Sequence, residues 1–136
     1  MISGREYLVR TIMNSDAHRI LSLIAAAIFA DKRVYATEID AFLKSAQNLK
    51  ALRRLVPNLS EAKLLSWYEL NKEDIRGKLS TPYFKDWFYE LLNALSNLPD
   101  KASILGAMAS VSEADGEIHV SERALIVLAE RHWGLR

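Results

Sequence analysis

The chain has 136 residues, 50% of them hydrophobic, and a formal net charge of +1, so it has the size and apolar content of one compact domain spanning residues 1–136. Its basic residues are scattered, which argues against a nucleic-acid partner because neutralising phosphates needs a concentrated basic face. It contains no cysteine, which excludes disulfides, thiolate zinc sites and thiol nucleophiles and fits a reducing cytoplasm.

Apolar residues at helical spacing run through most of the chain, and no segment shows the strict alternation of a strand. A short helix is expected over about 4–13. In chain order, longer helices are then predicted over about 16–30, 38–46, 49–56, 60–78, 82–95 and 100–114, with a last one between Ser121 and Gly134. The prediction is therefore an all-α bundle of about six or seven helices.

Several polar side chains mark the predicted helix starts. Thr37, Ser60 and Ser121 are interpreted as N-caps, because a hydroxyl oxygen accepts a bond from the free N–H groups of a first turn. The clearest start signal is the pair Thr81-Pro82. The helix after it carries a stripe of large apolar side chains, which favours core packing over a ligand wall. The stripe consists of Phe84, Trp87, Phe88, Leu91, Leu92 and Leu95.

The longest apolar stretch runs from Ile20 to Ala30 and is interrupted only by Ser22. Since a membrane-spanning helix needs about 20 apolar residues, this stretch predicts a central buried helix and no membrane span. Arg5, Glu6 and Arg10 interrupt the apolar content before it, so a signal peptide is not expected. A cytoplasmic location is the resulting expectation.

A short pattern occurs twice in the chain. The first copy reads ADKRVYATE from Ala30 to Glu38, and the second reads ADGEIHVSE from Ala114 to Glu122. Flanking residues match in the same register, as in the pairs Ala25 and Ala109, Ile24 and Met108, and Leu43 and Val127. We therefore predict a duplicated helix–turn–helix unit, with copies at about 16–46 and 100–135.

Each copy places an aspartate at the end of one helix and a glutamate at the start of the next. The helix dipole favours Glu38 and Glu122 in a first turn by roughly 0.3–1 kcal/mol and disfavours Asp31 and Asp115 near a C-terminus by a similar amount. The aspartates have two explanations, which the sequence leaves open. They either accept bonds from backbone N–H groups of the turn, or converge with the glutamates on a cation.

The second turn is richer in polar groups than the first. Glu113, Glu117 and His119 are weaker candidate ligands beside the two main carboxylates, and a lone turn histidine is more often a solvated side chain. An EF-hand is rejected because Val111 falls at the first loop position, where an oxygen ligand is required. A calcium or magnesium ion bound by oxygen atoms remains the candidate cofactor.

The two repeats, each a helix, an Ala-Asp turn, a Ser/Thr-Glu pair and a second helix, resemble the TerB-like family. That family includes tellurite-resistance proteins and the amino-terminal domain of DjlA-type membrane co-chaperones. The similarity covers about 16–46 and 100–135, whereas residues 48–97 match only in being helical. Lys32 departs from the pattern, because the family usually has glycine there, which argues against a metal site built on the first turn alone.

The resemblance implies a compact helical bundle with internal pseudo-twofold symmetry. It places the family's acidic positions on Asp31, Glu38, Asp115 and Glu122. TerB-like domains are associated with tellurite and stress response, divalent-cation binding and membrane-associated complexes, and they are not established enzymes. These properties are expectations for this chain.

The leading functional hypothesis is a non-enzymatic binding or regulatory module of stress-response type, which acts through an acidic site that takes a divalent cation. The alternative is a protein-interaction or dimerisation scaffold without metal, in which the carboxylates are helix caps. A small hydrolase ranks lowest, since no phosphate loop, nucleophile elbow or H-E-x-x-H motif is present. A protein partner or a second copy is expected, with Trp133 or Tyr35 as exposed anchors.

Overall fold

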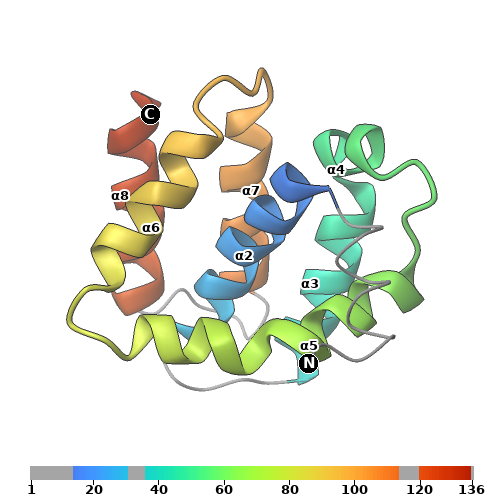
Figure 1. The fold of residues 1–136 in the computed structure, drawn as a ribbon, viewed down its shortest axis with the longest axis horizontal. Coiled ribbons are helices and arrows are strands. Elements are labelled where there is room, and N and C mark those ends of the chain that lie inside the picture. Colours follow the sequence, from blue (N-terminus) through green and yellow to red (C-terminus); the bar gives the residue numbers. More distant parts are fainter. Residues whose placement is uncertain (1–13, 31–35, 114–119, 136) are drawn as a thin grey trace.

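The computed structural model describes residues 14–30, 36–113 and 120–135. This part of the chain contains seven helices and no strand, which confirms the predicted all-α bundle (Figure 1). The helices are α2 (Ser15–Phe29), α3 (Ala36–Asn48), α4 (Lys50–Leu55), α5 (Glu61–Leu79), α6 (Phe84–Ala94), α7 (Lys101–Ser112) and α8 (Val120–Trp133). The short helix expected over about 4–13 lies outside the described residues. None of the described helices is long and apolar enough to cross a membrane.

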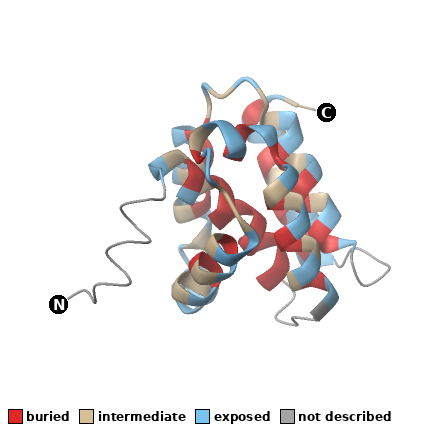
Figure 2. Ribbon diagram, turned by 90° about the vertical axis from the view of Figure 1, so that its right-hand side faces the viewer, coloured by how far each residue is buried: buried red, intermediate tan, exposed pale blue. Residues whose placement is uncertain are grey.

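Helix α2 forms the centre of the bundle. It begins after Asn14, whose side-chain oxygen accepts a 2.7 Å bond from the backbone N–H of Asp16. Every residue from Ile20 to Phe29 is buried, and α2 contacts all six of the other described helices. Figure 2 shows this buried helix inside the half-exposed ones. The predicted central helix is thus confirmed, and its uninterrupted apolar run reflects contacts on all sides.

The two repeats form the pairs α2–α3 and α7–α8. Helices α2 and α7 pack against each other, and each of them contacts both α3 and α8. The four repeat helices therefore form one contiguous group, in which the first helices of the two copies are in direct contact. The superposition of the two units stays a prediction. Their matched alanines differ, since Ala25 is fully buried and Ala109 is half-buried.

Three of the four predicted helix starts are wrong. Helix α5 begins as predicted, with the Ser60 side chain accepting a 3.2 Å bond from the N–H of Lys63. Helices α3 and α8 begin one residue before Thr37 and Ser121, so these hydroxyl residues lie inside the first turn. Thr81 does not cap α6, because its hydroxyl donates to the Lys78 carbonyl at 2.9 Å and closes the end of α5.

The aromatic stripe of α6 packs into the core as predicted. Phe88, Leu92 and Leu95 are buried, and the rest of the stripe is partly buried against them. The expectation that Trp133 is an exposed anchor is wrong. Its side chain is only 9% exposed, and its indole N–H donates to the Leu92 carbonyl at 2.9 Å. This carbonyl lies in the last turn of α6, where it also accepts bonds from the Leu95 N–H at 3.2 Å and the Ser96 hydroxyl at 3.0 Å.

Candidate functional site

The matched glutamates of the two repeats are both fully buried. Glu38 and Glu122 are each the third residue of their helix, α3 and α8, and each has 0% of its surface exposed. The third helical position is where a glutamate side chain can reach back to the cap N–H. Their place in a first turn was predicted, but their burial was not. An ionised carboxylate is buried only where the fold supplies strong polar interactions.

The charge of Glu38 acts on Tyr68 of α5. Burial raises the pKa of the Tyr68 phenol above its ordinary value of 10.0; Glu69 and Glu38 raise this pKa further, and Arg76 lowers it. The Tyr68 ring also lies against the rings of Phe29 and Phe42, at 5.8 and 5.4 Å between centroids. The first-repeat glutamate therefore belongs to the interface of α2, α3 and α5.

Most of the other predicted metal ligands cannot be located in the described part of the chain. Asp31, Asp115, Glu117 and His119 lie outside the described residues, so the convergence of the acidic turns stays a prediction. Glu113 is exposed at the end of α7, where its backbone N–H donates to the Ala109 carbonyl at 3.0 Å. Within the ranges 14–30, 36–113 and 120–135, no three His, Asp or Glu side chains form a metal-sized group.

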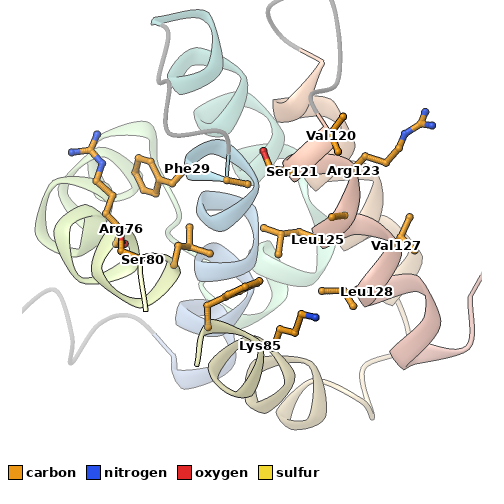
Figure 3. Close-up of a pocket in the computed structure, with 14 residues that line it drawn as sticks. Phe29, Arg76, Ser80, Lys85, Val120, Ser121, Arg123, Leu125, Val127 and Leu128 are labelled. Atoms are coloured by element: carbon orange, nitrogen blue, oxygen red, sulfur yellow. The ribbon is translucent and has the colours of Figure 1, made fainter. Parts of the chain in front are cut away.

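A larger feature, which the sequence did not reveal, is an apolar groove of about 960 Å³. Its walls come from the ends of α2 and α5, the start of α6 and the N-terminal half of α8 (Figure 3). Its apolar lining consists of Phe29, Ala30, Leu79, Phe84, Val120, Ala124, Leu125, Val127 and Leu128. We call this feature the α5–α8 groove.

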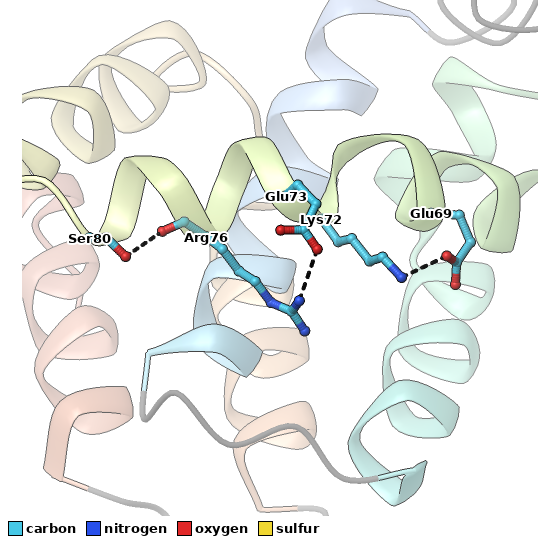
Figure 4. Close-up of polar contacts among 5 residues, drawn as sticks. All are labelled: Glu69, Lys72, Glu73, Arg76 and Ser80. Carbon is cyan, nitrogen blue, oxygen red and sulfur yellow. Dashed lines mark hydrogen bonds and ion pairs between the residues drawn. The ribbon is translucent and has the colours of Figure 1, made fainter.

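Three cations and no acidic side chain stand among the described lining residues of the α5–α8 groove. They are Arg76 on α5, Lys85 on α6 and Arg123 on α8. The Arg76 guanidinium lies 4.7 Å from the Phe29 ring centroid and 3.1 Å from a Glu73 carboxylate oxygen (Figure 4). Lys85 and Arg123 are exposed and form no ion pair with any residue in the described part of the chain.

Apolar surface is exposed at the rim of the α5–α8 groove. Val120 is 88% exposed at the start of α8, and Tyr83, next to the lining residue Phe84, is 71% exposed. Val120 lines the groove, so its exposed side chain extends the apolar lining to the surface, whereas Tyr83 is not a lining residue. One sequence feature indicates this exposed position. Val120, an apolar residue, directly precedes the Ser-Glu pair, at the start of a helix where polar capping residues are common.

Two histidines, His18 and His132, link neighbouring helices. His18 of α2 accepts a 3.0 Å bond at Nδ1 from the indole N–H of Trp67. The His132 ring of α8 lies 5.2 Å from the Tyr89 ring, and its Nε2 is 2.6 Å from the side-chain oxygen of Asn93. The first contact joins the exposed His18 to the buried Trp67, and the second joins side chains of α6 and α8, so both histidines have a structural role.

No known protein-family model, curated protein or solved structure matches this chain. The TerB-like resemblance therefore rests on the two repeats alone and stays a hypothesis.

Proposed function

We propose that this chain is a non-enzymatic binding module, which works by holding a partner in the α5–α8 groove. The observation that carries this proposal is the groove itself. Its volume of about 960 Å³ lies at the upper end of the range of roughly 300–1,000 Å³ for ligand sites, and apolar walls with a few polar groups are typical of such sites. The proposal develops the interaction-scaffold hypothesis by assigning the binding of a partner to the α5–α8 groove. A role in stress response of the TerB-like type is part of the proposal, supported by the repeats.

An anionic fluorescent dye, anilinonaphthalene sulfonate, tests whether the groove accepts a ligand. Its emission should rise on binding the chain, because the apolar walls displace water from the dye. Ala124 is exposed on the groove wall, so Ala124→Trp should fill the groove and abolish most of the rise. Ala62→Trp is the matched control, since Ala62 is an exposed alanine at the far end of α5.

Circular-dichroism melting curves of the two variants should match that of the unchanged chain, because both sites are exposed. Equal dye emission from the Ala124→Trp and Ala62→Trp variants would place the dye elsewhere and refute a ligand site in the groove.

A second candidate function is divalent-cation binding at the acidic turns. The observation that favours it is the full burial of Glu38 and Glu122 at matched positions. A cation that binds the folded state raises its melting temperature by mass action. If the site exists, millimolar calcium, magnesium or manganese should raise the melting temperature, and Glu122→Gln should remove that rise. A melting temperature indifferent to all three ions leaves the two glutamates as buried first-turn residues.

A further inference from the structure

We infer that the α5–α8 groove binds an acidic amphipathic α-helix of a protein partner. This inference rests on the proposed binding function and names the chemistry of the partner. It follows from the open side of the groove, from the placement of the cations and from the exposed apolar rim.

The open side of the groove favours a helix over a small molecule. A small ligand is held by burying roughly 70–90% of its surface. Along α8, however, Val120, Ser121, Arg123 and Ala124 all line the groove and are all exposed. The groove is therefore open to water along the first two turns of α8. An amphipathic helix suits this arrangement, because it buries an apolar face and leaves a polar face solvated.

The cations of the groove indicate that the partner helix carries acidic residues on either side of its apolar face. Arg76, Lys85 and Arg123 come from three different helices and lie on different sides of the groove (Figure 3). Arg76 is already paired with Glu73. Lys85 of α6 and Arg123 of α8 are therefore the two lining cations without an ion pair in the described part of the chain. Two cations on two different helices suit an occupant that carries more than one anionic group. A helix with several Asp or Glu residues beside its apolar face presents a negative charge to each side. Complementary charges of this kind set orientation and association rate.

The same charges disfavour a second copy of this chain as the occupant. In a symmetric dimer each groove would face the same groove of the other copy, which would bring like-charged rims together. Lys85 and Arg123 would then be opposed by cations, without a compensating acidic residue among the described groove residues. The rim therefore selects a partner of opposite charge.

The apolar floor supplies the contacts for anchoring side chains. Phe84 of α6 and Leu128 of α8 are half-buried in the groove, and Leu125 closes its base. The exposed Val120 extends this surface at one end. An incoming helix with leucines at positions i, i+3, i+4 and i+7 presents one continuous apolar stripe to such a floor.

The test uses three labelled peptides of about 18 residues, a length at which an isolated helix can form. The first carries a leucine stripe flanked by glutamates, the second has lysines in place of the glutamates, and the third has the first composition with the leucines scattered. Fluorescence anisotropy with the full chain measures each Kd. The first peptide should bind in the micromolar range, and the other two at least about tenfold more weakly.

The rim is tested by the double variant Lys85→Gln with Arg123→Gln. It should weaken the glutamate peptide by about three- to twentyfold and reduce the salt dependence of the Kd. The matched control is Lys44→Gln with Arg53→Gln, which removes two exposed cations from α3 and α4 and should change the Kd by less than about twofold. Neither helix lines the groove.

The outcomes separate this inference from the proposed function. Equal affinity for the lysine peptide and the glutamate peptide, or a Kd that the rim variant does not change, would overturn the inference that the partner is an acidic helix. A loss of dye binding in the Ala124→Trp variant would still support the groove as a ligand site. Binding to anionic phospholipid vesicles without peptide binding, or a dimer in light scattering that Ala124→Trp dissociates, would equally overturn the acidic helix. If neither the dye nor any peptide responds to Ala124→Trp, both proposals fail.

Discussion

The two repeats carry the same motif but occupy different environments. In the first repeat, α2 is buried on all sides because α4, α5 and α6 pack around it. In the second repeat, α7 contacts only α2, α3 and α8 among the described helices, and it exposes Ala102, Ser103, Gly106 and Ser110. The helices between the repeats pack on α2 and not on α7, so the first helix of the first repeat is the more deeply buried of the two.

The same asymmetry places the α5–α8 groove beside the second repeat. The helices of the middle segment cover the first repeat, and the end of α5 and the start of α6 line the groove together with the first half of α8. The duplicated unit therefore supplies a buried glutamate in each copy. The inserted helices complete a groove that α8 of the second copy lines over several turns, whereas the first copy contributes only Phe29 and Ala30 among the described residues.

The largest expected effect compares one leucine at matched positions of the two repeats. Leu21 is fully buried in α2, whereas Leu105 is half-buried in α7. Leu21→Ala should cost about 2–5 kcal/mol of unfolding free energy, because it leaves a cavity in a packed core. Leu105→Ala should cost markedly less, since solvent reaches part of its site. Urea unfolding of both variants measures the difference, and equal losses would contradict the unequal burial of the repeats.

A smaller effect concerns the matched glutamates. Glu38→Ala and Glu122→Ala should each cost about 1–3 kcal/mol, because they remove a buried polar group and strip its surroundings of a partner. Glu61 is the control, since it lies in the first turn of α5 but is exposed. Glu61→Ala should cost only the dipole contribution of about 0.3–1 kcal/mol. Equal losses of stability in thermal melts of the three variants would mean that burial of Glu38 and Glu122 does not contribute to the free energy of unfolding.

The smallest effect is the titration of Tyr68. Burial, Glu69 and Glu38 raise its pKa above 10.0 against the opposing charge of Arg76. Above about pH 10 the unfolded chain releases this proton while the folded chain keeps it, so the contribution of Tyr68 to stability falls as the pH rises through the folded pKa.

The difference in tyrosinate absorbance between the unchanged chain and Tyr68→Phe isolates that titration. Its midpoint should lie above 10.0, and Glu38→Gln should lower it, because one of the nearby negative charges is then removed. A midpoint at or below 10.0 would mean that Tyr68 is not in the environment described.

The helices were predictable because apolar spacing reports one buried face, as in the stripe of α6. The starts of α3, α6 and α8 were not, because a hydroxyl such as that of Thr81 can bond to the end of one helix as well as cap the next. The sequence placed Glu38 and Glu122 in first turns, yet burial depends on which helices pack over them. The groove combines residues as distant as Phe29 and Leu128, so no local pattern could indicate it.

The most direct test of the groove is a nuclear magnetic resonance titration of the full, nitrogen-15-labelled chain with the glutamate peptide. If the peptide binds in the groove, backbone amide shifts should concentrate at the end of α5, the start of α6 and the first half of α8. Amides of α3 and α4, which do not line the groove, should stay in place. Shifts centred on α3 and α4, or no shifts with the peptide in excess, would contradict binding in the groove.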